Sequence, residues 1–215
     1  RKPLGPFWSK LLMKYISYVI ARDYGFAPNP FHGVCTLATC KPVIRNAAEV
    51  GDWVFGSGAV SLGRRGYLIL AMRVTDKLTY DDYFQSSQYQ CKKPILHGSL
   101  KQTYGDNIYH RDSHGEWIQS DSHHSNPDGT VNLHNLKRDT KSKYVLISKD
   151  FYFFGENAIK PAAPLNNALF QGRNFKYIDE SEGSKLVKYL RDNFELGYHG
   201  NPIQFHNFTR YDGLS

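Results

Sequence analysis

The fold of this chain is decided by residues 53–74, which read WVFGSGAVSLGRRGYLILAMRV. Two runs of strand-forming residues, Trp53–Ala59 and Tyr67–Val74, flank a connection that contains Gly63 and Gly66. Two such runs joined by a short glycine-bearing segment are typical of a β-hairpin. We therefore expect a hairpin here, with the rest of the fold built around it.

Further strands and two helices are expected on both sides of this hairpin. A helix should begin after Thr79, whose hydroxyl can cap the helix N-terminus. A second helix is expected over Glu182–Phe194, because Leu186 and Leu190 recur at helical spacing. Four more runs are rich in β-branched and aromatic residues and are predicted to be strands: Lys14–Ala21, Val34–Ala38, Tyr144–Ser148 and Phe151–Phe154.

The segment Cys91–Asp139 shows little periodicity and is rich in Gly, Asn, Asp, Ser and His. It is much longer than an ordinary connection, and its aromatic residues favour an ordered, functional loop. Strands followed by a closing helix, without a repeated βαβ pattern, indicate an α+β fold. The prediction is a PUA-like mixed β-sheet or small β-barrel with flanking helices and a long ordered loop.

The length of 215 residues suits one domain, predicted over 14–215. Residues 1–13 are interpreted as a flexible extension or one added by cloning, because they lack the features of a secretory signal. No apolar run is long enough to span a membrane. Three cysteines are too few and of the wrong parity for a disulfide framework, so we expect a reducing compartment and predict a cytoplasmic location.

The formal charge of +7 and the pI near 9.2 favour a polyanionic partner. Basic residues interleaved with aromatic ones suit contact with phosphates and stacking on bases. The alternative is that these charges only solvate a face of the protein. Nucleic acid or nucleotide is thus the expected partner, and no cofactor is indicated.

The densest group of chemically active residues lies in the predicted long loop. Histidine titrates near neutrality and aspartate can orient it, so the candidate catalytic residues are His110, Asp112, His123 and His124. Candidate ligand-binding residues in the same segment are Asn107, Tyr109, Arg111 and Trp117. Three interpretations remain open: these residues catalyse a reaction, they bind a ligand, or their polar groups hydrogen-bond to one another and hold the loop in shape. Adjacent histidines on an extended chain point to opposite sides, so no metal site is predicted.

A second candidate stretch is the proline-rich turn, residues 24–33, which carries Phe26, Asn29, Phe31 and His32. Stiff loops of this kind often line a ligand pocket, although they also cover the ends of barrels. The residues after the turn include Cys35, Cys40, Lys41 and Arg45, which would bring polar and positively charged groups to the same side of the molecule. We expect the turn and the histidine-bearing segment to close over one shared hollow.

Several of these stretches resemble a bacterial and phage family, the nucleotide modification associated domain, type two. They are residues 18–31 (YVIARDYGFAPNPF), 35–42 (CTLATCKP), 51–54 (GDWV), 105–110 (GDNIYH) and 120–124 (SDSHH). The resemblance covers nearly the whole chain after Met13. It implies a role beside enzymes that make or handle modified bases in DNA.

The order of the elements is also similar to the PUA-like superfamily, which includes the EVE, ASCH and YTH domains. The similarity rests on residues 51–54, the hairpin, and residues 71–76 (AMRVTD) and 80–83 (YDDY). It implies a small β-barrel and an aromatic-lined pocket that reads a modified base.

Three hypotheses follow for the function. The first is recognition of modified nucleic acid or nucleotide by accepting a base in an aromatic and histidine-lined pocket beside a basic surface. The second is an enzyme, a hydrolase or base-modifying enzyme, that acts on modified nucleotides or DNA with a His/Asp site. The third is an interaction subunit with protein partners in an anti-phage defence or modification system. Whether the chain is an enzyme is left open.

Overall fold

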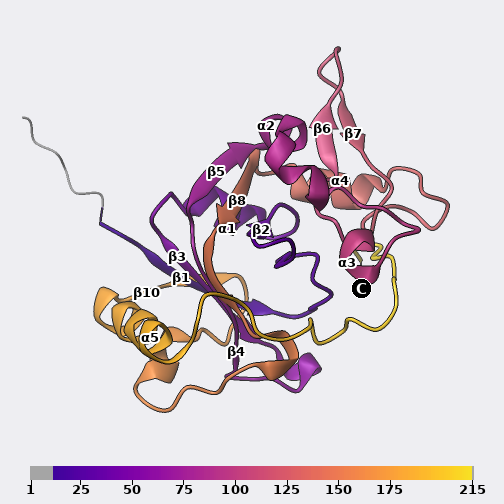
Figure 1. The fold of residues 1–215 in the computed structure, drawn as a ribbon. Coiled ribbons are helices and arrows are strands. Elements are labelled where there is room, and N and C mark those ends of the chain that lie inside the picture. Colours follow the sequence, from indigo (N-terminus) through magenta and orange to yellow (C-terminus); the bar gives the residue numbers. More distant parts are fainter. Residues whose placement is uncertain (1–11, 215) are drawn as a thin grey trace, which may run out of the picture.

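The predicted hairpin lies at the centre of the computed structural model, which describes residues 12–214 (Figure 1). Strand β3 (Trp53–Gly58) pairs antiparallel with β4 (Leu68–Arg73), and a bulge shifts the register at Gly56 and Ser57. The connection contains a short 3-10 helix, η1 (Val60–Leu62). The hairpin prediction is confirmed.

The hairpin belongs to a six-stranded mixed sheet with the order β10-β1-β3-β4-β9-β11. Strand β1 (Tyr15–Ile20) runs parallel to β3, whereas β9 (Asp150–Phe153) is antiparallel to β4. The edge strands are β10 (Phe175–Ile178) and the two-residue β11 (Gly197–Tyr198). Because β10 and β11 do not pair with each other among the described residues, the sheet stays open. The α+β class and the mixed sheet are confirmed, and the closed-barrel alternative is wrong.

Successive side chains of a strand point to opposite faces of the sheet, so neighbouring residues pack in two different cores. Tyr15 and Trp53 pack with Leu186 and Leu190 of helix α5 (Glu180–Asn193), which covers one face of the sheet. Ile16 and Val54, one residue further on, join a second cluster with Leu37, Ile44 and Leu146. Each such side chain contributes about 1.5–3 kcal/mol on burial. The helix predicted over 182–194 therefore has the packing role that its periodicity indicates.

A smaller sheet covers the other face, with the order β2-β8-β5. Its strands are β2 (Cys35–Leu37), β8 (Tyr144–Ser148) and β5 (Asp76–Thr79), and helix α1 (Pro42–Ala47) contacts β8. Helix α2 (Tyr80–Gln85) follows β5 directly. The Thr79 hydroxyl accepts the Asp82 N–H at 3.2 Å, which confirms the predicted cap.

The segment expected to be a long ordered loop, residues 91–139, is ordered and contains several short elements, and we call it the insert. It contains the end of η2 (Ser87–Lys92), α3 (Leu100–Thr103), the hairpin of β6 (Tyr109–Arg111) and β7 (Trp117–Gln119), and α4 (Leu133–Asp139). The sequence does not predict these individual elements, because elements of three to seven residues are too short for a periodic pattern to show. The segment is ordered, as expected.

The C-terminal segment runs back from the large sheet to the insert (Figure 1), where Asn135 of α4 donates to the Tyr211 carbonyl at 2.6 Å. The Tyr211 N–H donates to the carbonyl of His123 at 2.7 Å, and the Thr209 N–H donates to the Tyr104 hydroxyl at 3.1 Å. Two further 3-10 helices, η3 (Gly155–Asn157) and η4 (Leu165–Ala168), connect β9 to β10. Within residues 12–214 no helix combines the length and apolar character needed to cross a membrane. The extension expected over residues 1–13 lies largely outside the described residues, because the structure describes the chain only from Leu12 onward.

Candidate active site

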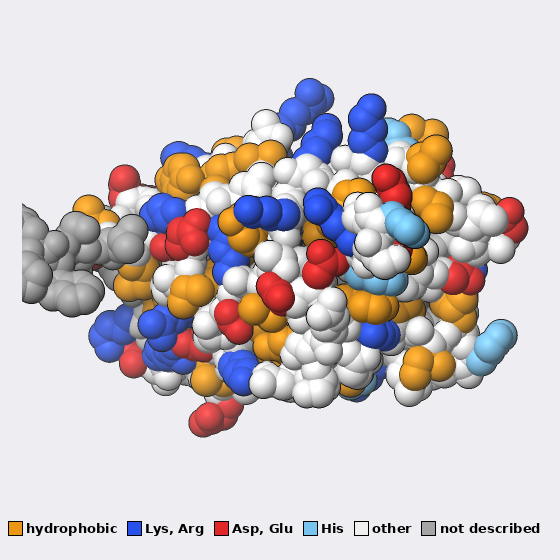
Figure 2. Space-filling model, turned by 90° about the horizontal axis from the view of Figure 1, so that it is seen from above, with side chains coloured by type: hydrophobic (Ala, Val, Ile, Leu, Met, Phe, Trp, Pro, Cys, Tyr) orange, Lys and Arg blue, Asp and Glu red, His pale blue; other side chains and the backbone are white. Residues whose placement is uncertain are grey.

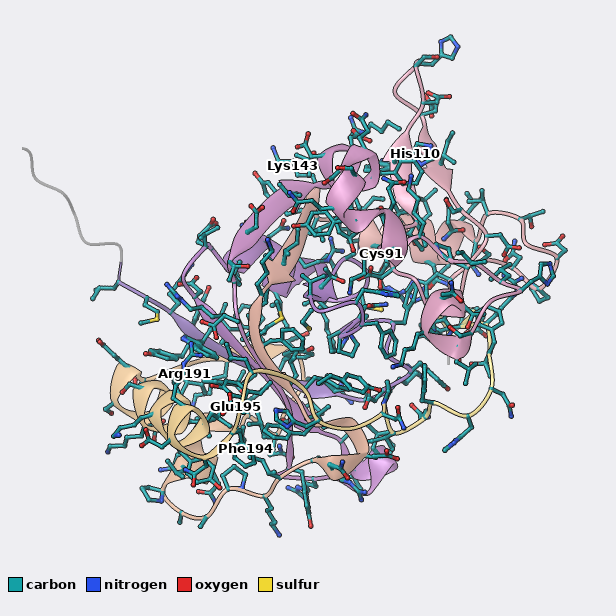
Figure 3. The ribbon with its side chains drawn as sticks, viewed as in Figure 1. Cys91, His110, Lys143, Arg191, Phe194 and Glu195 are labelled. Atoms are coloured by element: carbon teal, nitrogen blue, oxygen red, sulfur yellow. The ribbon has the colours of Figure 1, made fainter. Side chains whose placement is uncertain are left out.

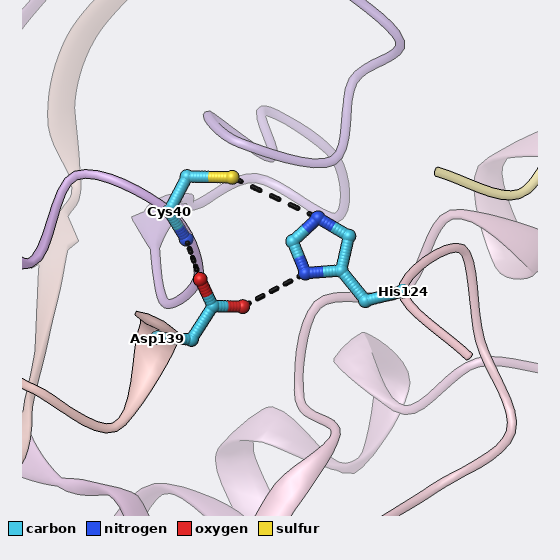
Figure 4. A group of neighbouring side chains, drawn as sticks. All are labelled: Cys40, His124 and Asp139. Carbon is cyan, nitrogen blue, oxygen red and sulfur yellow. Dashed lines mark hydrogen bonds and ion pairs between the residues drawn. The ribbon is translucent and has the colours of Figure 1, made fainter. Parts of the chain in front are cut away.

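Three side chains from distant parts of the chain meet in a relay (Figure 4). The Cys40 Sγ lies 3.7 Å from Nε2 of His124, and Nδ1 of His124 lies 2.8 Å from the Asp139 carboxylate. His124 and Asp139 are fully buried, whereas Cys40 is partly exposed. A thiol, an imidazole and a carboxylate in this order form the arrangement that activates a cysteine nucleophile.

The backbone around the thiol has an uncommon conformation. Cys40 and Lys41 both have positive φ, at 52° and 39°, a region that costs a side-chain-bearing residue roughly 1–3 kcal/mol. Two buried partners hold the backbone there. Oδ1 of Asp139 accepts the Cys40 N–H at 2.9 Å, and Nε of Arg45 donates to the Cys40 carbonyl at 2.9 Å. The strain is thus held at the residue whose thiol faces the imidazole.

Asp139 ends helix α4 and is the hub of the site. Besides Cys40 and His124, its carboxylate accepts hydrogen bonds from the Tyr109 hydroxyl at 2.9 Å and from Arg138 Nε at 3.1 Å. Its backbone carbonyl accepts a 2.6 Å hydrogen bond from Arg45, which is completely buried. A buried carboxylate with four donors is fixed in place and stays ionised.

The charges of the three groups depend on one another. Burial favours neutral His124, but the carboxylate of Asp139 and the thiolate of Cys40 raise its pKa to about 9. Burial also opposes ionisation of Cys40, yet the adjacent His124 and Arg138 hold the pKa of the thiol below its ordinary value. For Asp139, the cations His124, Arg138 and Arg45 outweigh burial and lower the pKa to about 2. Each charge thus favours the other, so the site stabilises a thiolate beside a protonated imidazole.

Cys40 opens into a pocket of about 330 Å³. Its apolar walls include Ile20, Ala27, Ile44 and Phe175. Positive charge comes from Arg22, Lys41 and Arg138, and none of the described lining residues is acidic. The Tyr211 ring lies between two guanidinium groups, 4.5 Å from that of Arg22 and 5.4 Å from that of Arg138.

Arg138 links the pocket to the relay, because its Nη2 lies 3.8 Å from the Cys40 sulfur. Elsewhere the surface charge is mixed: on the face that Figure 2 shows, lysine and arginine side chains lie among acidic ones. The net charge alone therefore does not mark a binding face. The lining of the Cys40 pocket differs from this surface, because none of its described residues is acidic.

The same three side chains could also be considered as metal ligands, because their ligand atoms lie within 4.8 Å of one another. However, Asp139 directs one oxygen to the Cys40 N–H and the other to His124 Nδ1, on the far side of the imidazole from the thiol (Figure 4). Only Cys40 Sγ and His124 Nε2 face a common point. A catalytic zinc site has three protein ligands, so the arrangement suits a relay better than an ion.

His123, the neighbour of His124, has a structural environment. The two residues lie in a turn with their rings 5.5 Å apart, and so they do not point to opposite sides as expected for an extended chain. His123 packs against Tyr24, Phe26 and Tyr104, and burial is the main cause that lowers its pKa to about 3. It is neutral in the folded protein, with Nδ1 against the carbonyl of Thr209.

The other predicted catalytic residues lie on the β6–β7 hairpin. His110 lies on β6 (Figure 3), and its ring stacks on that of Phe84 of α2 with the ring centres 3.8 Å apart. Asp112 accepts the N–H groups of His114 and Glu116 and so shapes the hairpin turn. On the same hairpin, the Arg111 guanidinium lies 4.7 Å from the Trp117 ring.

The remaining predicted binding residues divide into buried and exposed groups. Asn29 and Asn107 are buried and bind backbone: Asn29 donates to the Tyr104 carbonyl, and Asn107 donates to the carbonyls of Tyr83 and Tyr89. Phe26 packs on both His123 and His124, so the proline-rich turn and the insert do meet, in a packed contact. Phe31 and His32 line a different hollow. Of the predicted binding residues, Lys41 lines the Cys40 pocket, and Tyr109 and Arg45 support the relay.

The sequence analysis does not include Cys40 or Asp139 among the candidate site residues. Cys40 lies 84 residues before His124, and no local spacing connects the two. A usable signal existed nonetheless: an odd cysteine in a chain with unassigned His and Asp residues is a candidate nucleophile.

Comparison with known proteins identifies the family to which the chain belongs. A family model described as nucleotide modification associated domain 2 matches residues 12–209. The chain belongs to this family. No curated protein and no solved structure is similar enough to match. Membership of the nucleotide modification associated domain 2 family connects the chain with nucleotide modification, and the match spans Cys40, His124 and Asp139.

Proposed function

We propose that the chain is a thiol-dependent enzyme of nucleotide modification, with Cys40 as nucleophile, His124 as acid and base, and Asp139 as the residue that orients and charges His124. The observation that carries this proposal is the buried Cys40–His124–Asp139 relay opening into an acid-free pocket. Structural cysteines are rarely paired with a charged imidazole, because burial without function favours neutral forms.

The chemistry follows from the charges. The Cys40 thiolate forms a bond to an electrophilic carbon, of which a carbonyl carbon is the type that Cys–His relays usually process. The bond to the leaving group breaks with its electron pair, and His124 gives its proton to that group. Water, deprotonated by His124, then forms a bond to the same carbon, the carbon–sulfur bond breaks with its electron pair on sulfur, and the thiolate and the protonated imidazole are restored. Proton transfer of this kind contributes roughly 10²–10⁴-fold in rate.

The substrate class follows from the pocket. Lys41 and Arg138 place positive charge beside the thiol, and the apolar walls with the Tyr211 ring suit a flat, partly apolar group. A nucleotide, free or within a nucleic acid, combines an anionic phosphate with such a group. The family connection to nucleotide modification supports the same class.

A chloroacetylated nucleoside 5′-monophosphate and the same compound without its phosphate form a matched pair of probes. The wild-type protein should be labelled at Cys40, and the phosphorylated probe should react at least about tenfold faster, since one charged contact is worth on the order of 1.5–3 kcal/mol. Peptide mass spectrometry assigns the labelled cysteine. In Arg138→Gln the preference for the phosphate should shrink.

Exposed Cys91 is the internal control for this labelling. Equal labelling of Cys40 and Cys91, without preference for the phosphate, would contradict the proposal.

Recognition without turnover is the second candidate, because the basic and aromatic pocket could hold a modified base as a reader does. Cys40→Ser separates the two functions. A reader keeps its function as well as its affinity for the nucleotide in this variant, whereas an enzyme keeps the affinity and loses turnover.

A further inference from the structure

A second hollow of about 340 Å³ lies apart from the Cys40 pocket and shares no lining residue with it. We call it the Tyr198 groove. It is lined by the end of the proline-rich turn (Phe31 and His32), by Lys101 of α3, by Lys149 and by Tyr198 of β11. Ala27, from the same turn, lines the Cys40 pocket, so one stiff loop borders both hollows.

The groove combines aromatic surface with positive charge. Tyr198 is 37% exposed, and its ring stacks at 5.9 Å on buried Phe153, which fixes it at the surface. The ammonium group of Lys101 lies 5.2 Å from the centre of the Tyr198 ring and 5.8 Å from that of Phe31. Lys149 and His32 are exposed beside them.

Acidic groups near the groove are already engaged. Asp23 is buried and accepts the N–H of Ile203, and Glu156 accepts hydrogen bonds from Asn201. None of the described residues that line the groove is acidic. Consistent with this local field, burial and then the charges of Lys92 and Lys101 lower the pKa of His32. An anion that enters the groove therefore meets two lysines and no carboxylate in the lining, whereas the charges of Asp23 and Glu156 reach Tyr198 and, after burial, raise its pKa to about 12.

We propose that the Tyr198 groove binds single-stranded nucleic acid, with a base against Tyr198 and the adjoining phosphates on Lys101 and Lys149. A partly exposed aromatic ring beside two lysines suits a single strand, because stacking tolerates any base and the positive charges follow the backbone. The Lys101 side chain is long enough to turn from the ring to a phosphate. An acidic peptide would use the lysines but leave the ring without a role.

Fluorescence anisotropy with a labelled ten-residue oligo-thymidylate tests the groove in the full chain. The double variant Lys101→Glu/Lys149→Glu should bind at least about tenfold more weakly. Its slope of log affinity against log salt should be smaller by about 1.4, because each lost phosphate contact on a single strand removes about 0.7. The control Lys176→Glu/Lys185→Glu changes the same net charge at exposed positions on β10 and α5, and should weaken binding less than threefold.

The role of the ring is tested with an abasic strand of the same length. Stacking is worth about 1–3 kcal/mol per base, so the wild type should prefer the base-bearing strand by about tenfold. Tyr198→Ala should abolish this preference and Tyr198→Phe should keep it. On the unaltered protein, the oligonucleotide should protect Lys101 and Lys149 from acetylation and leave Lys185 reactive, which gives a result independent of variant folding.

Two outcomes would overturn the proposal: no binding of the oligonucleotide by the wild type, or equal losses in the two double variants with no protection of Lys101. Labelling of Cys40 by the nucleotide probes is a separate measurement. Failure of the groove proposal therefore leaves the proposed thiol chemistry standing, and the reverse also holds.

Discussion

Two histidine-bearing parts of the insert contain the same residue types but have different surroundings. In the turn at 121–125, His124 lies between a thiol and a buried carboxylate that come from other parts of the chain. On the β6–β7 hairpin, His110 stacks on Phe84, and Asp112 serves the backbone of its own turn. The local density of reactive residues is similar, and only the distant partners differ. Chemistry here is created by tertiary contacts, and composition only marks candidates for it.

The largest expected difference between the two parts is in stability. Asp139→Asn replaces an anion with four donors around it by an amide with a single acceptor oxygen, next to a charged imidazole. Breaking such a buried network costs about 3–5 kcal/mol. Asp112→Asn keeps an acceptor for the two turn N–H groups and should cost less than about 0.5 kcal/mol. Urea unfolding of both variants measures the contrast, and similar losses would show that Asp139 is not a hub.

The next effect is on the reactivity of the thiol. His124→Gln removes the imidazolium that holds the pKa of Cys40 below its ordinary value. At pH 6.5 the alkylation of Cys40 should slow by about tenfold, because a smaller fraction of the thiol is then ionised. His110→Gln should leave the rate unchanged. If both variants slow equally, the relay has no special effect on the thiol.

A smaller effect, on the pH dependence of stability, distinguishes His123 from its neighbour His124. The pKa of His123 falls from 6.5 to about 3 on folding, mainly through burial. The unfolded chain therefore binds more protons between these values, and stability falls as the pH drops below 6.5, by up to about 1.4 kcal/mol per pH unit. His123→Phe keeps an aromatic ring in this position and should flatten that dependence between pH 5 and 6.5 in urea titrations. An unchanged slope would show that other groups cause the acid sensitivity.

The sequence predicts the parts of the fold whose signal is local. The strands at 15–20, 53–58, 68–73 and 144–148 follow from β-branched and aromatic runs, and α5 follows from its leucine spacing. The insert does not follow, because α3, α4 and the β6–β7 hairpin are stabilised by packing of residues such as Tyr104 and Tyr109 against the rest of the chain. Short elements of this kind depend on tertiary contacts more than on propensity.

For the candidate site, the sequence predicts the kinds of residue involved better than it predicts which residues of each kind come together. His124 is among the predicted catalytic residues, and Lys41 among the predicted binding residues. Asp139 appears in the sequence only as one acid among basic residues, and Cys40 as one of several polar groups after the proline-rich turn. Both matter because a left-handed backbone at Cys40 and the end of α4 bring them together. That contact spans 99 residues, which no local pattern encodes.

The most direct test of the thiolate–imidazolium pair is the rate of Cys40 alkylation by iodoacetamide from pH 5 to pH 9, with Cys91 quantified in the same digest. We expect the Cys40 rate in the wild type to persist to lower pH than in His124→Gln, because His124 stays protonated up to about pH 9 and holds the pKa of the thiol below its ordinary value. In His124→Gln the fall in rate should begin at higher pH, since less of the thiol is ionised at any given pH. A wild-type rate at Cys40 that follows the variant's profile would contradict the pair and, with it, the proposed role of Cys40 as nucleophile.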